Sequence, residues 1–211
     1  PGLLVHRTKL AKDADTFALQ ILRNQIDQHV YPIHRLDRKT SGVLLFALND
    51  EMLKTMQKAF ADRLVTKTYL AIVRGEMPAE SGVVSLPIGR HPVNRKKMST
   101  RSPRSRTAET RWKLRRAFQG ASLLEVALKT GRTHQIRVHA AANGNPIAGD
   151  SKYADDDINR EFRALGLGRL FLHAASLRLT LPAGETFELV APLAPDLEAF
   201  LLTPSYDGSS T

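Results

Sequence analysis

The chain carries the local patterns of many strands and few helices. Apolar runs, or segments rich in β-branched and aromatic residues, predict strands at residues 43–48, 68–73, 122–129, 172–181 and 185–190. Helical spacing of apolar residues predicts helices at 13–30, from about 50, at 133–142 and from 196. Because a doubly wound parallel sheet requires strands and helices to alternate, this irregular order predicts a single α+β domain.

Two local patterns predict the strand at residues 43–48 and the starts of the helices on either side of it. Residues 43–48 follow Gly42 and hold no polar side chain, which is typical of a fully buried strand. Asn49 or Asp50 comes next and is the expected cap of the following helix, as Asp15 is of the preceding one.

The composition excludes several classes of site. The chain has no cysteine, which removes disulfides, thiolate zinc sites and cysteine nucleophiles and is consistent with a reducing, cytoplasmic setting. No apolar run approaches the roughly 20 residues of a membrane span, so we expect no membrane association. The chain starts at Pro1 rather than Met, which suggests a trimmed product lacking an upstream segment.

The basic residues are concentrated in one stretch. Of 31 Lys and Arg, eleven lie in residues 90–116 with one of the 21 acids, so the rest of the chain is balanced at 20 each. This basic segment predicts a contact with a polyanion, and its interleaved Ser and Thr favour nucleic acid. The alternative is a solvated loop. Its prolines predict loop or edge structure, and Trp112 is expected to pack in a core or under the segment.

One acid stands in a basic cluster at residues 34–42. Asp37 has Arg35, Arg38 and Lys39 as neighbours, and these favour its ionised form. An ionised carboxylate is a poor general acid but a suitable nucleophile or base. The alternative is a surface loop in which Asp37 caps a turn, and the spacing alone does not separate the two.

A second polar cluster occupies residues 130–139. On a helix, His134 and Arg137 share a face, so Arg137 can reach a carboxylate on another element. His134 and His139 lie on different faces, and no Cys is available, so no metal site is expected. The chain also lacks the short motifs of serine hydrolases, P-loop proteins and dinucleotide-binding proteins.

These clusters resemble the motifs of the RluA-type pseudouridine synthases. The signature match is His34-Arg35-Leu36-Asp37 followed by Thr40-Ser41-Gly42-Val43-Leu44-Leu45. Further matches, in the family's order, lie at residues 1–6, 67–75, 130–139, 146–150 and 172–174. The resemblance extends from Pro1 to about residue 200.

The resemblance implies one catalytic domain at residues 1–202, with a flexible tail at 203–211. The implied fold has a mostly antiparallel mixed sheet and a central cleft flanked by helices. The family usually has a strand and a lysine ahead of Pro1, so the N-terminal strand is expected to be truncated. The implied reaction is isomerisation of uridine in RNA to pseudouridine, with the base flipped out and without cofactor or metal, by a monomer that binds no DNA.

The resemblance also assigns roles to residues. Asp37 is the essential carboxylate, as a nucleophile at C1′ or a base at the ribose, and Arg137 keeps it ionised. Tyr69 stacks on the uracil and is a candidate to help remove its C5 proton. Arg35 braces the vacated stack, and Leu172 lines the uracil pocket. Further contacts with RNA, or support for the site, are expected from His34, Arg132, His134, Gln135, Arg95, Lys96 and Lys97.

The RNA target is less sharply indicated. Residues 4–7 and 23–30 resemble the branch that modifies transfer RNA, whereas residues 168–175 resemble the branch that modifies large-subunit ribosomal RNA. We favour ribosomal RNA. A competing hypothesis is a non-catalytic RNA-binding or ribosome-assembly protein that uses the same basic segment, and a third is a hydrolase that releases uracil.

Overall fold

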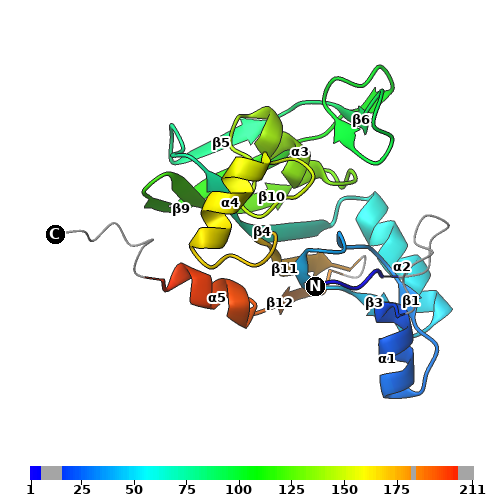
Figure 1. Cartoon of the computed structure of the whole chain (residues 1–211). Coiled ribbons are helices and arrows are strands. Elements are labelled where there is room, and N and C mark those ends of the chain that lie inside the picture. Colours follow the sequence, from blue (N-terminus) through cyan, green and yellow to red (C-terminus); the bar gives the residue numbers. More distant parts are fainter. Residues whose placement is uncertain (6–15, 182–183, 204–211) are drawn as a thin grey trace.

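The computed structural model describes residues 1–5, 16–181 and 184–203. Within them the largest sheet has seven strands (Figure 1), with β2 (Ser41–Gly42) beside β11. The other six follow the order β12 (Thr186–Val190), β11 (Leu172–Thr180), β4 (Val65–Arg74), β10 (Ala121–Leu128), β9 (Thr110–Phe118) and β5 (Ser81–Val84). All pairs are antiparallel except β2 with β11. This confirms the predicted α+β fold with a mostly antiparallel mixed sheet.

Two small sheets accompany the large one. One pairs β1 (Tyr31–Pro32) with β3 (Phe46–Ala47). The other joins β6 (Ile88–Arg90), β7 (Met98–Ser99) and β8 (Ser105–Arg106) into a lobe of residues 88–106. We call it the basic lobe; Figure 1 shows it projecting from one end of the molecule.

The predicted loop or edge structure of the basic segment is correct only for its first part. Residues 110–116 belong to β9, which lies inside the sheet between β10 and β5. This strand alternates, so its charged side chains point to solvent while Trp112 and Leu114 pack on the core. The alternation is what makes a basic strand possible in the sheet interior.

The helices overlap the predicted ranges, with one addition, but the helix predicted over 13–30 ends at Ile26 because Asp27 takes a left-handed conformation. They are α1 (Ala18–Ile26), α2 (Asp50–Ala61), α3 (Gln135–Ala142), α4 (Asp156–Ala164) and α5 (Pro195–Leu201). Asn49 caps α2 by accepting a hydrogen bond from the Met52 N–H at 2.8 Å. The polar helix α4 was not predicted. Asp15 and residues 204–211 of the predicted tail lie outside the described residues.

Strand β4 separates two parts of the core. Tyr69, Ala71 and Val73 face a cluster that includes Ile136 of α3. Ile72 faces the opposite cluster, which holds Phe162 of α4 and residues of α5. The period of two in β4 therefore assigns Tyr69, and with it Lys67, to the α3 side of the sheet.

The prediction of a fully buried strand at residues 43–48 is wrong. Only β3, within this run, is a strand. Val43 and Leu45 pack from one side against a cluster that includes Met56 of α2, and Leu48 is 50% exposed. Leu44 and Phe46, which alternate with Val43 and Leu45, are only half-buried, so the run is covered unevenly instead of being buried on both faces.

Gly42 fixes the start of this region. Its φ is 110°, and a Cβ at this position would lie 2.1 Å from the Ala174 carbonyl oxygen. The neighbouring Val43 N–H donates to the same oxygen at 2.9 Å. This close approach of backbone to backbone requires glycine and anchors residues 34–40 against β11.

We predict that Gly42→Ala is far more destabilising than Gly144→Ala. Gly144 also has a positive φ, 83°, but nothing lies within 4 Å of its added Cβ. The left-handed backbone alone costs about 1–2 kcal/mol. Displacing β11 should bring the loss for Gly42→Ala to at least about 3 kcal/mol. Urea unfolding of both variants measures this, and equal losses would contradict it.

Candidate active site

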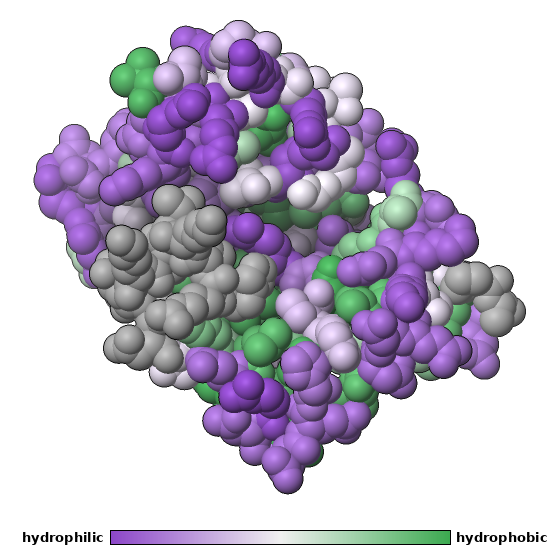
Figure 2. Space-filling model, turned by 90° about the vertical axis from the view of Figure 1, so that its right-hand side faces the viewer, coloured by the Kyte–Doolittle hydropathy of each residue, from purple (hydrophilic) through white to green (hydrophobic). Residues whose placement is uncertain are grey.

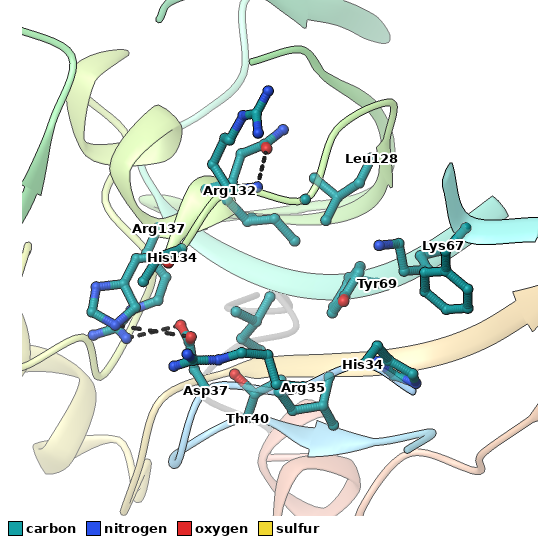
Figure 3. Close-up of a pocket in the computed structure, with 17 residues that line it drawn as sticks. His34, Arg35, Asp37, Thr40, Lys67, Tyr69, Leu128, Arg132, His134 and Arg137 are labelled. Atoms are coloured by element: carbon teal, nitrogen blue, oxygen red, sulfur yellow. Dashed lines mark hydrogen bonds and ion pairs between the residues drawn. The ribbon is translucent and has the colours of Figure 1, made fainter. Parts of the chain in front are cut away.

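A cleft of about 400 Å³ lies between residues 34–40, strand β4 and residues 128–137. In Figure 3 the 34–40 loop forms one wall, the segment with Leu128 and Arg132 forms the other, and β4 runs behind them. Nine of the sequence-predicted site residues line it: His34, Arg35, Asp37, Tyr69, Arg132, His134, Gln135, Arg137 and Leu172. Arg95, Lys96 and Lys97 do not, because they belong to the basic lobe.

Asp37 is held inside the cleft by a short turn. The Thr40 N–H donates to the Asp37 carbonyl at 2.9 Å, and β2 follows at once. The Asp37 side chain is 16% exposed, and one oxygen, Oδ2, accepts a hydrogen bond from Arg137 Nη1 at 3.0 Å. The backbone forms the turn and the carboxylate faces the cleft, so the alternative in which Asp37 merely caps a surface turn does not fit.

Arg137 is shared between two carboxylates. Its Nε and Nη2 each donate to an oxygen of Asp150 at 2.8 Å, while Nη1 serves Asp37. The Arg137 side chain is 5% exposed and that of Asp150 is fully buried. Burial alone would lower the pKa of Arg137, but the hydrogen bonds and charges of Asp150 and then Asp37 outweigh it and raise that pKa. The guanidinium is therefore a permanent cation.

Asp150 is a residue that sequence reasoning missed. It accepts further hydrogen bonds from the backbone N–H groups of Lys152 and Tyr153, at 2.9 and 3.3 Å. A signal was present, because Asp150 follows the buried residues Ile147 and Ala148. An acid in such a setting needs a cationic partner.

Tyr153, also missed, connects the site to the basic lobe. The Met98 N–H donates to its hydroxyl at 2.9 Å, and the hydroxyl lies 2.7 Å from His134 Nδ1. Its ring centre lies 5.1 Å from Arg137 Cζ, within the range of a cation–π contact. Tyr153 therefore touches the lobe, His134 and Arg137 at once.

His134 completes the surroundings of Asp37. Burial lowers the pKa of His134 to about 4, so the ring is neutral at neutral pH. His134 Nε2 lies 3.8 Å from Asp37 Oδ1. The second oxygen of Asp37 thus faces a neutral imidazole beyond hydrogen-bond distance, rather than a second cation.

Tyr69 stands on the floor of the cleft. It is 8% exposed and pairs in register with Ala174 on one side and Val126 on the other. Burial, and then the charge of Asp37, raise the pKa of Tyr69 to about 12, so the phenol keeps its proton at neutral pH. Lys67 lies two residues earlier on the same face, with Nζ 5.4 Å from the Phe60 ring centre, and burial lowers its pKa.

Two other predicted residues hold the walls in place. His34 Nε2 accepts the Leu45 N–H at 3.1 Å, and its ring stacks on Phe60. Gln135 accepts from Thr130 Oγ1 and the Arg132 N–H and donates to Thr110 Oγ1 and the Glu109 carbonyl. Because both ends of its amide are engaged, Gln135 supports the cleft wall. Arg35 is exposed at the cleft, and Leu172 is buried beside it.

The described residues hold neither a cluster of metal ligands nor a membrane-spanning helix. Across residues 1–5, 16–181 and 184–203, no three His, Asp or Glu side chains are grouped as metal ligands would be. In the same part of the chain, no helix has the length and apolar character needed to cross a bilayer.

Comparison with known proteins decides the family. The sequence model of the RNA pseudouridylate synthases matches residues 1–142. The chain belongs to this family. The predicted resemblance and the predicted enzyme class, RNA pseudouridine synthase, are thereby confirmed at the level of the family.

Individual relatives of this chain are also named as pseudouridine synthases. The tRNA pseudouridine synthase C of Haemophilus ducreyi is 42% identical over 86% of this chain and 79% of its own length. The ribosomal large subunit pseudouridine synthase C of Pasteurella multocida is 40% identical over 80% of this chain, which spans 52% of that protein. The solved structure of human RNA Pseudouridylate Synthase Domain Containing 1 has a TM-score of 0.77 at 28% identity, over 94% of this chain and 86% of its own.

We predict that His34 makes the folded state acid-sensitive. Burial, and then the charge of Lys67, lower the pKa of His34 from 6.5 to about 4. Between those values the unfolded chain binds more protons, so stability falls as the pH drops. His34→Gln keeps an acceptor for the Leu45 N–H but removes this titration. Urea unfolding at several pH values should show a slope shallower by up to about 1.4 kcal/mol per pH unit, and parallel curves would contradict this.

Proposed function

We propose that this synthase converts a specific uridine of structured RNA to pseudouridine through Asp37, without a cofactor. The observation that carries the proposal is the isolation of Asp37. It is the sole acid among the described residues that line the cleft, it is hydrogen-bonded to Arg137, and it shares the cleft with Tyr69. Binding a polyanion alone gives no reason to place a carboxylate in a basic cleft.

The reaction needs an ionised carboxylate but no other reagent. The N1–C1′ bond breaks, the uracil turns, C5 bonds to C1′, the C5 proton leaves and N1 ends protonated, so atoms are conserved. Asp37 either attacks C1′ or takes a proton from the ribose, and both roles use its charged form. The Arg137 guanidinium favours that form.

Tyr69 is assigned to the uracil. Because its pKa is raised to about 12, Tyr69 is protonated at neutral pH and has no free phenolate to take a proton, which favours packing against the detached base over proton abstraction. Leu172 gives the same pocket an apolar wall. The cleft is large enough for one flipped nucleoside, and the exposed Arg35 at its edge is placed to brace the stack that the base leaves.

The basic lobe is assigned to the RNA backbone. Arg95 and Lys96 are exposed and Lys97 is half-buried, on the turn between β6 and β7. In Figure 2 hydrophilic side chains cover the upper part of the face that bears the lobe, above a hollow with hydrophobic residues at its floor. Cations in this position can fix the register of the RNA while the cleft takes the target base.

For the target we propose large-subunit ribosomal RNA, with transfer RNA as the second candidate. The two relatives described above are named for these two substrates and are almost equally identical to this chain. Mapping pseudouridines in total RNA from cells lacking the protein would distinguish the two. A missing large-subunit pseudouridine supports the proposal, and a missing transfer-RNA pseudouridine overturns it.

We expect Asp37→Asn to abolish tritium release from RNA labelled at uridine C5 while RNA affinity stays within about threefold. Asn keeps the shape of the side chain and an acceptor for Arg137, which also retains Asp150, so the fold should persist. Asp50→Asn, on the exposed surface of α2, is the control and should release tritium at the wild-type rate. Retained turnover by Asp37→Asn would exclude Asp37 as the catalytic group.

We expect neutralisation of the lobe to weaken binding to every RNA. Replacing Arg95, Lys96 and Lys97 by Ala should reduce the magnitude of the negative slope of log affinity against log salt by about two to three. A control with the same loss of charge replaces three exposed arginines outside the lobe and cleft: Arg74, Arg160 and Arg178. An equal change of slope in both variants would mean that the lobe is not a specific contact surface.

A further inference from the structure

We propose that a second groove, which opens out of the cleft, binds the phosphates of the RNA strand next to the target uridine; this inference rests on the proposed function. The groove has a volume of about 190 Å³ and lies between the end of α2 and the turn that leads from β10 to α3. It shares Phe60, Lys67, Leu128, Gly131 and Arg132 with the cleft, so the two are continuous.

The charge of the groove has one sign. Of the residues that the structure describes, four cations line it, Arg63, Lys67, Lys129 and Arg132, and no acid does. Arg63 and Lys129 are exposed, and within the described part of the chain neither side chain has a hydrogen bond or an ion pair. Arg132 donates from Nε to the Thr107 carbonyl at 3.0 Å. Cations that the protein itself leaves unneutralised along a groove are suited to a chain of phosphates.

Two acids beside the groove do not compensate for these charges: Asp62 adjoins Arg63 in sequence, and the Glu109 carbonyl accepts a hydrogen bond from the Lys129 N–H. Asp62 pairs with Lys58, and Glu109 pairs with Arg111 at 2.8 Å. Neither acid lines the groove. The positive field therefore remains available to a ligand, and it leads directly toward the cleft that holds Asp37.

Lys67 marks the junction of groove and cleft. It lies on the same face of β4 as Tyr69, and Figure 3 shows it on the side of Tyr69 away from Asp37. A strand whose base is turned onto Tyr69 can therefore continue past Lys67 into the groove. The basic lobe joins the site from the other side, through Tyr153. The two cationic surfaces would hold the RNA on both sides of the flipped nucleotide.

The backbone of Arg63 supplies a clean variant. Arg63 follows α2 with a φ of 60°, a left-handed conformation in which glycine is the usual residue. Arg63→Gly therefore removes the cation and should preserve or raise stability. Lys129→Ala removes the second exposed cation just after β10. Thermal unfolding of the double variant then separates lost binding from lost folding.

The test measures binding of a fluorescein-labelled 12-nucleotide single-stranded RNA, with one central uridine among adenosines, at five salt concentrations. The Arg63→Gly/Lys129→Ala variant should bind about tenfold more weakly at low salt. The negative slope of its log affinity against log salt should be smaller in magnitude by about 1.4. Arg74→Ala/Arg178→Ala removes two exposed cations elsewhere and should leave the slope within about 0.3 of wild type.

The outcomes separate the groove from the reaction. An unchanged slope in the groove variant, or an equal change in the control, overturns the groove even if the wild type forms pseudouridine. A reduced slope specific to the groove variant supports the groove even if no RNA tested is isomerised, in which case it is the proposed function that fails.

Discussion

The guanidinium of Arg137 is the interaction on which the site depends. It joins α3 to the 34–40 loop through Asp37 and to the turn after β-bridge residue Ile147 through Asp150. Removing one partner of such a buried pair leaves an uncompensated charge, at about 3–5 kcal/mol. Because Asp150 takes two of the donated hydrogen bonds, Asp37 receives one. Within the described residues the other oxygen of Asp37 has no cationic partner, which suits the reactive role that we propose for this carboxylate.

This arrangement works only if the backbone on each side is fixed. Gly42 sets the 34–40 loop against β11, and Ser41 adds hydrogen bonds to His173 and from Arg169. On the other side Tyr153 ties His134 and Arg137 to the first residue of β7. The Asp37 carboxylate is thus positioned by the sheet, whereas its surroundings are continuous with the lobe that we assign to RNA. Contact with RNA at the lobe and geometry at Asp37 share one tyrosine.

The sequence predicted the parts of this molecule that depend on local pattern. The strand containing Tyr69, the helix containing Arg137 and the cap at Asn49 follow from periodicity and side-chain chemistry within a few residues. The prediction of a fully buried strand at 43–48 was wrong because the burial of a strand depends on the elements that cover its two faces, and these are not part of the run itself. Helix α4 was missed because its few apolar side chains, such as Phe162, stand among charges. The roles of Asp150 and Tyr153 depend on partners 13 to 55 residues away, which no local pattern reveals.

The distribution of charge along the sequence likewise does not predict where the folded protein has a positive field. Residues 90–116 carry the whole net charge, yet Arg111 and Arg115 are paired with Glu109 and Glu125 on the sheet surface, so the field of this segment is concentrated in the lobe. The remainder of the chain is balanced in number but not in space. Folding brings Arg63, Lys67, Lys129 and Arg132 together along one groove while acids such as Asp62 are neutralised by pairing elsewhere. A segment that is neutral on average can therefore still guide a polyanion toward one carboxylate, because the field depends on which charges remain unpaired and where.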